Sequence, residues 1–255
     1  MEPAALLAWP ARERVDLNGW VLRFTDGYTH RGNSVATFAF NGNDVESAID
    51  RVEREYRARN LPPMFQVAAH VEPATLPSAL VERGYDVISP TFVRAATPAR
   101  VLSHCPDAED VTIESGVSAA FARLVRAGSP KGSETQERLA ILDGDARERL
   151  DILHRVTVPL GCITAFEKGQ AVACGMGVNV DGKVGVNLMR TDVAHRRKGH
   201  AQRVLSAIAQ WAREQGADTL YLGVEMANTP AVLLYERAGF EPAYSYRYYV
   251  KGRHS

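Results

Sequence analysis

Three consecutive cations stand beside small residues at one point of the sequence. Arg196, Arg197 and Lys198 are followed by Gly199 and, one residue later, by Ala201. An apolar run typical of a strand precedes them, and a helical pattern follows. A helix N-terminus offers unpaired N–H groups and the positive end of the helix dipole, and small residues leave those groups uncovered. The stretch therefore predicts a binding site for a phosphate or pyrophosphate group.

Two better-known phosphate-binding patterns do not fit this stretch. It lacks the glycine spacing and the Gly-Lys-Ser/Thr ending of a Walker loop, and it lacks the three glycines of the dinucleotide fingerprint. A solvated basic turn is the alternative interpretation, and it would be preferred if the cations stood alone. The flanking strand, the small residues and a second motif downstream favour the phosphate site.

That second motif reads Asn228-x-x-Ala231-x-x-x-Tyr235-x-x-x-Gly239-Phe240. It resembles one signature of the GNAT superfamily of N-acetyltransferases, and Arg196-x-x-Gly199-x-Ala201 resembles that family's acyl-CoA pyrophosphate motif. Each motif alone has modest specificity. Their order and separation also match the family, and the resemblance covers residues 111–250.

The resemblance implies a fold and a reaction. The fold is an α/β (α+β) arrangement, in which a mixed and mostly antiparallel sheet is flanked by helices. The reaction is transfer of the acetyl group of acetyl-CoA to a primary amine, by direct attack in a ternary complex. The backbone of residues 189–191 would pair with the pantetheine arm, and residues 196–201 would hold the diphosphate. The residues implied in coenzyme A binding are Met189, Arg190, Thr191, Arg196, Arg197, Lys198, Gly199, His200, Ala201, Asn228 and Tyr235.

Transfer from a thioester to an amine has three chemical requirements. The amine must be neutral, the carbonyl oxygen needs a hydrogen-bond donor, and the departing thiolate needs a proton. The resemblance assigns the donor to the backbone amide of Met189 and the proton to the hydroxyl of Tyr235. A phenol with a pKa of about 10 is a weaker acid than a thiol with a pKa of about 8.5, so the donation relies on proximity. A packed core aromatic is the alternative for Tyr235.

The group that takes the proton of the amine is less well defined. Many relatives use a carboxylate or a histidine on the strand before the basic stretch, and residues 184–190 contain neither. Glu225, at the end of the next expected strand, is the candidate base, acting directly or through water. The alternatives are that Glu225 orients the acceptor or is solvated, and that catalysis depends on positioning an amine that is already partly neutral.

The elements that position these residues fall into two halves. Residues 98–109 contain two prolines and no sustained periodicity, which is typical of a linker. We expect an N-terminal lobe over residues 1–97 and the catalytic domain over residues 110–255. Within the second half, three antiparallel strands joined by turns at Lys168-Gly169 and Asp181-Gly182 are predicted to lead into the basic stretch.

The two halves resemble copies of one unit. An offset of 155 residues places Phe65 on Leu220, Leu80 on Tyr235, and Gly84 on Gly239. Glycine after a helix is common, so coincidence is the alternative, but a duplicated architecture is preferred. The N-terminal copy is degenerate, and the arrangement is similar to the tandem type found in part of the GNAT superfamily.

The N-terminal copy lacks the residues that carry the chemistry. Leu80 stands where Tyr235 stands, Pro73 stands where Asn228 stands, and residues 40–44 replace the basic stretch. We therefore expect no second active site in this lobe, which either walls the acceptor pocket or only completes the core. The contacts it would supply to an acceptor are Arg23, Tyr28, Arg31 and Asn33.

Composition narrows the expected partners. The 255 residues include 30 Lys+Arg and 30 Asp+Glu, and 45% are hydrophobic, which predicts a globular protein without a long-range field for nucleic acid or a membrane. Cys105, Cys162 and Cys174 are too widely spaced for a disulfide framework or a zinc site, and no metal is expected. Neither a signal peptide nor a membrane span is predicted, so a cytoplasmic location is expected.

The acceptor stays open at this level. A small-molecule amine is preferred, because a covering N-terminal lobe would narrow the cleft. A protein lysine or N-terminal acetyltransferase is one alternative, and a non-catalytic acyl-CoA-binding sensor is another. A monomer or a homodimer is expected.

Overall fold

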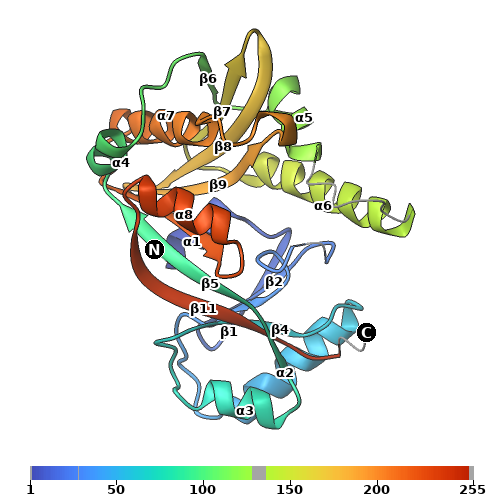
Figure 1. Ribbon diagram of the computed structural model, residues 1–255. Coiled ribbons are helices and arrows are strands. Elements are labelled where there is room, and N and C mark those ends of the chain that lie inside the picture. Colours follow the sequence, from blue (N-terminus) through green and yellow to red (C-terminus); the bar gives the residue numbers. More distant parts are fainter. Residues whose placement is uncertain (1, 28, 128–135, 253–255) are drawn as a thin grey trace.

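The computed structural model describes residues 2–27, 29–127 and 136–252. Within them, one sheet of eleven strands runs through both halves of the chain in the order β1-β2-β3-β4-β11-β5-β10-β9-β8-β7-β6 (Figure 1). Adjacent strands are antiparallel except in the pairs β3–β4 and β9–β10. This arrangement confirms the predicted fold class. The strands are β1 (Glu13–Leu17), β2 (Trp20–Phe24), β3 (Val35–Ala36), β4 (Met64–Ala68), β5 (Asp86–Ala96), β6 (Val111–Glu114), β7 (Leu160–Glu167), β8 (Gln170–Val180), β9 (Lys183–Thr191), β10 (Thr219–Glu225) and β11 (Glu241–Val250).

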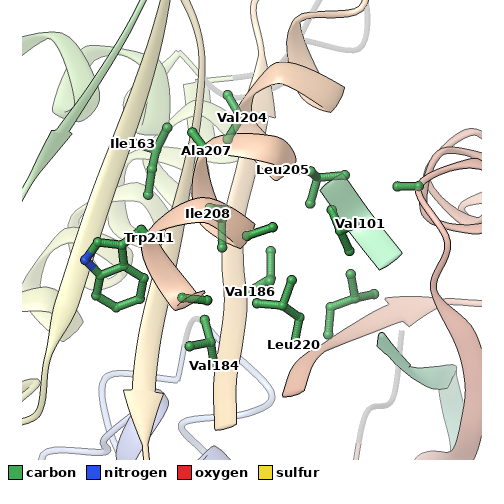
Figure 2. Packing of buried hydrophobic residues seen from close by; sticks show 14 of the residues in the cluster. Val101, Ile163, Val184, Val186, Val204, Leu205, Ala207, Ile208, Trp211 and Leu220 are labelled. Carbon is green, nitrogen blue, oxygen red and sulfur yellow. The ribbon is translucent and has the colours of Figure 1, made fainter. Parts of the chain in front are cut away.

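Helices cover both faces of the strands β7 to β9. One face packs against α7, which in turn contacts α4, and the other face packs against α1, α5 and α6. Figure 2 shows the first of these cores, in which the apolar stripe of α7 lies on alternate residues of the strands. The helices are α1 (Glu2–Ala8), α2 (Val45–Ala58), α3 (Leu76–Glu82), α4 (Pro98–His104), α5 (Ala119–Arg126), α6 (Gln136–Arg155), the 3-10 helix η1 (Val193–His195), α7 (His200–Glu214) and α8 (Thr229–Arg237).

The two halves exchange one strand each at the centre of the sheet. β5, from the N-terminal half, lies between β10 and β11, and β11, from the C-terminal half, lies between β4 and β5. Figure 1 shows these two long strands running side by side. Each half therefore contributes a strand, a helix and a returning strand, and the returning strand of the other half lies between its two strands.

The exchange agrees with the predicted repeat. β5 begins at Asp86 and β11 at Glu241, and α2 begins at Val45 and α7 at His200, which keeps the offset of 155 residues. The duplication predicted from sequence is thus visible in the element order. Its degenerate copy is the N-terminal half, where α2 begins after Asp44 rather than after three cations.

Some local expectations need correction. The expected linker begins with α4, because Thr97 caps this helix by accepting from the Arg100 N–H and Pro98 occupies its first turn. The tight hairpin of the N-terminal half joins β1 to β2 at Asn18-Gly19, where both residues have positive φ. Neither α1 nor β1 was expected. Because one sheet crosses both halves, the expected domain boundaries stay a prediction.

None of the helices in the described residues is both long enough and apolar enough to cross a membrane.

Candidate functional site

A cavity opens where two parallel strands separate. β9 and β10 pair only through residues 183–185 and 219–221, after which β9 runs on beside β8 while β10 stays paired with β5. The cavity between them has a volume of about 470 Å³. Five of the predicted site residues line it: Met189, Arg190, Glu225, Asn228 and Tyr235.

A β-bulge sets the edge of β9 in this cavity. The pairing with β8 shifts register between Cys174 and Met176, and Leu188 has a φ of 51°. Gly175 lies opposite the bulge, and a Cβ on it would collide with Sδ of Met189. The Met189 side chain thus packs toward α7, while its residue lines the cavity. The role of the Met189 amide as the carbonyl donor stays a prediction.

The basic stretch forms the turn that leads from β9 into α7. Its three cations are exposed, Arg197 and Gly199 have positive φ, and no side chain caps α7. A Cβ placed on Gly199 would meet no atom within 4 Å, so the first turn of α7 faces open space. An uncapped helix N-terminus with exposed cations fits a diphosphate.

Glu167, at the end of β7, draws part of this stretch away from that space. Its Oε2 lies 3.3 Å from Nζ of Lys198, and 3.6 Å from Nε2 of both His195 and His200. His200 is buried, its Nδ1 accepts from Arg203 at 3.1 Å, and burial lowers the pKa of its imidazole. The side chain of His200 is thus engaged within the protein, and only its backbone N–H could contact a diphosphate.

Thr191 and Ala201 flank the turn. The carbonyl of Thr191 accepts from Nε of Arg196 at 3.4 Å, and Ala201 is the second residue of α7. Neither residue lines the cavity, and neither do the residues of the basic stretch. The predicted site residues thus divide into a group at the cavity and a group at the start of α7.

Tyr235 and Asn228 come from α8, which begins beside the end of β10. Asn228 caps this helix by accepting from the Ala231 N–H. Tyr235 is buried with its ring 5.9 Å from that of Phe240, and burial raises the pKa of its hydroxyl to about 12, an effect that the charge of Arg190 opposes. The phenol therefore stays protonated across the neutral range and can donate.

Glu225 projects from the last position of β10 and is exposed. Its cross-strand neighbour on β5 is Thr91, whose neighbour on β11 is Tyr246. Among the described residues, no hydrogen bond or ion pair engages its carboxylate. An exposed carboxylate that lines the cavity can accept a proton or hold an ammonium group.

The N-terminal half supplies the facing wall. Arg31 lies in the cavity, and its Nη1 donates to Oδ1 of Asn187 on β9 at 2.7 Å. Of the other predicted contacts, Arg23 is buried behind it, Asn33 uses its side chain to hold the loop through the N–H groups of residues 25 and 27, and Tyr28 lies outside the described residues. The sequence reasoning missed Trp9, Thr29, His30, Thr91, Tyr246 and Tyr248, which also line the cavity.

A family model for the "Probable histone acetyltransferase Rv0428c C-terminal" matches residues 1–249. The chain belongs to this family. Its match spans both halves of the fold, so the duplicated architecture is the unit of the family rather than an addition to it. The protein is an acetyltransferase of the GNAT type, which confirms the resemblance found in the two motifs.

Among family relatives, the chain is 26% identical over 257 residues to an uncharacterized N-acetyltransferase, YobR, of Bacillus subtilis (strain 168), covering 98% of this chain and 97% of that one. Among solved structures, a GCN5-related N-acetyltransferase from Kribbella flavida has a TM-score of 0.69 at 20% identity and covers 98% and 95% of the two chains. A tandem GNAT protein from the clavulanic acid biosynthesis pathway has a TM-score of 0.63 at 10% identity and covers 100% and 88%. The fold is thus shared over its full length.

Proposed function

We propose that the protein transfers the acetyl group of acetyl-CoA to the primary amine of a small-molecule acceptor, by direct attack while both substrates are bound. The observation that carries the proposal is the meeting of the Met189 backbone, Tyr235 and Glu225 in one cavity that the N-terminal half walls off. Proton acceptor, carbonyl donor and proton donor are thus available at one place.

Acetyl-CoA, when bound, supplies the acetyl group as a thioester. The turn from Arg196 to Ala201 would hold its diphosphate, since the uncapped start of α7 faces open space. The edge of β9 at residues 189–191 would pair with the pantetheine arm, because β10 leaves that edge after residue 185. Asn228 is placed to contact the same arm from the start of α8.

Tyr235 and Glu225 then divide the proton transfers. The Tyr235 hydroxyl, which is protonated throughout the neutral range, gives its proton to the departing thiolate, and because its raised pKa makes it a weak acid the donation relies on proximity. The positive charge of Arg190 favours the phenolate that remains. Glu225, which lines the same cavity, accepts the proton of the amine, directly or through one water.

A small acceptor fits the walls of this cavity better than a polypeptide does. Trp9, His30 and Tyr248, from three separate segments, line it together with residues of the C-terminal half. We expect these bulky side chains to restrict the entry of a polypeptide more than that of a small amine. The family name refers to a histone acetyltransferase, so a protein acceptor is the competing candidate.

The test is thiol release from acetyl-CoA with a panel of small amines, beside peptides of histone tails. Release with small amines, and an intersecting pattern of initial rates when both substrates are varied, is the expected result. Release only with the peptides would assign a protein acceptor. Background release in every case, with coenzyme A still raising the melting temperature, would assign an acyl-CoA sensor and overturn the proposal.

A further inference from the structure

We propose that the acceptor carries an acidic group in addition to its amine, and that Arg31 binds this acidic group. The inference rests on the proposed function, because it names the class of acceptor that enters the same cavity. The proposal favours amino acids, and other amines that carry a carboxylate or a phosphate, over polyamines and amino sugars.

Positive charge predominates in the cavity. The described residues that line it include three arginines, Arg31, Arg149 and Arg190, and a single carboxylate, Glu225. A polycationic acceptor would bring more positive charge into a space with one acid to receive it, and like charges at short range repel. An acceptor with one amine and one acidic group can pair its amine with Glu225 and its acidic group with an arginine.

Arg31 has donors to spare on its cavity side. Its Nη1 donates to Asn187, a second side-chain hydrogen bond joins it to Tyr248, and its Cζ lies 5.1 Å from the centre of the Trp9 ring. In the part of the chain that the structure describes, no carboxylate lies within ion-pair distance of it. A guanidinium has five donors in a planar fork, so donors remain for a carboxylate or a phosphate.

A second guanidinium, that of Arg23, lies near the first, and no carboxylate of the described residues is within ion-pair distance of it. Arg23 is 1% exposed and donates to the neutral oxygens of Ser34 and Gln66 at 2.7–2.8 Å. Burial lowers the pKa of Arg23, and the charge of Arg31 lowers it further. Burying two neighbouring cations among neutral partners has an unfavourable desolvation free energy, and a bound anion offsets part of it.

The floor between the two ends of the cavity is kept clear by a glycine. Gly223 is exposed on β10, and a Cβ on it would lie 3.3 Å from the Tyr246 hydroxyl and 3.8 Å from Nη2 of Arg31. Glu225 is two residues further along the same strand, so it projects from the same face about 7 Å away. That spacing lets a compact acceptor place its acid at Arg31 and its amine at Glu225.

The test compares acceptors that differ only in the acidic group. β-Alanine, O-phosphoethanolamine and ethanolamine share an aminoethyl unit with a carboxylate, a phosphate or a hydroxyl, and tyrosine with tyramine and ornithine with putrescine form further pairs. Two readouts are taken: thiol release from acetyl-CoA, and the shift in melting temperature in the presence of coenzyme A. The first reports transfer, and the second reports binding even if no transfer occurs.

We expect the acidic member of at least one set to have a kcat/KM about 10- to 100-fold above its uncharged partner, and to stabilise the protein where the partner does not. Arg31→Gln should reduce that preference to a few-fold, and Arg31→Lys should keep part of it. Arg51→Gln, on the exposed face of α2, is the matched control and should leave the preference unchanged. A larger effect with the phosphate than with the carboxylate would name the phosphate as the recognised acid.

Two results would overturn the inference. One is that uncharged amines react and bind as well as their acidic partners in every set, which would leave acetyl transfer itself intact. The other is a preference for acids that survives Arg31→Gln in a folded variant. If acids stabilise the protein through Arg31 but no thiol is released, the acidic site stands and the proposed transfer fails.

Discussion

Arg31 of the N-terminal half donates a hydrogen bond of 2.7 Å to Oδ1 of Asn187, on the strand whose bulge presents Met189. This bond joins residues 156 positions apart and fixes one wall of the cavity to the other. The Nδ2 of Asn187 is in turn held by the carbonyl of Gly185. The degenerate half is therefore a structural part of the cavity and not only a complement to the core.

Tyr235→Phe should lower kcat about 100- to 10,000-fold, the range that a lost general acid typically costs, because the thiolate then leaves without its proton donor. Coenzyme A affinity should stay close to that of the parent protein, since the ring and its packing on Phe240 remain. Tyr249→Phe, in the N-terminal core, is the control for loss of a buried hydroxyl. Unchanged turnover in Tyr235→Phe would remove this residue as the acid.

The pH profile of the parent protein should lack a falling limb from Tyr235 in the mildly alkaline range. Burial raises the pKa of this phenol to about 12, so it remains protonated where a free tyrosine would begin to ionise at about pH 10. The same raised pKa contributes stability that is full below about pH 10 and is lost as the pH rises toward the folded-state value. The measurement is kcat against pH with the acceptor saturating. A decline near pH 9 that Tyr235→Phe abolishes would contradict the account.

Glu225→Gln should reduce kcat/KM most at low pH. The carboxylate is needed to take a proton from an ammonium group, whereas an amine that is already neutral needs no base. We expect kcat/KM to fall about 10-fold or more near neutral pH, and the deficit to shrink as the pH approaches the pKa of the acceptor amine. The measurement is the ratio of the two kcat/KM values across this range. A ratio that is constant with pH would show that Glu225 only orients the acceptor.

Arg196→Ala should weaken the binding of acetyl-CoA about 10-fold, because an exposed cation at the start of α7 is lost. S-acetylpantetheine, which has no diphosphate, provides the control donor, and its KM should not change. Arg213→Ala, at the opposite end of α7, should affect neither donor. Equal losses with both donors would show that the basic turn does not hold the diphosphate.

Local sequence was sufficient to predict the parts of the site that lie within one motif. Gly199 lies in the turn before α7, and Asn228 and Tyr235 lie at the start and in the body of α8, so neighbouring residues set their positions. Thr91 and Tyr246 could not be found in that way. They enter the cavity because β5 and β11 are exchanged between the halves, and such pairing depends on contacts far apart in the sequence.

The same reason explains why the helix α4 was not predicted within residues 98–109. Thr97 and Pro98 are helix-start signals, but a helix as short as α4 has little periodicity of its own. It is held by packing on α7, with Val101 fully buried in the core of Figure 2. That stabilising contact lies in the other half of the chain.

Gly223→Val should raise the KM of the acceptor and leave that of acetyl-CoA unchanged. The added side chain would project from β10 toward the Tyr246 hydroxyl and Arg31, where the acceptor is expected to lie. The melting temperature is measured as well, because the added Cβ would lie 3.3 Å from the Tyr246 hydroxyl, which must move slightly to accommodate it. An acceptor KM equal to that of the parent would place the acceptor outside this part of the cavity.

The central claim is that a small amine receives the acetyl group inside the shared cavity. The most direct measurement is a competition in one vessel, with isotopically labelled acetyl-CoA, an equimolar mixture of small amines and histone-tail peptides, read by mass spectrometry. The account predicts label on one or more small amines, and loss of that label with Tyr235→Phe. Label confined to peptide lysines, or transferred equally by Tyr235→Phe, would contradict it.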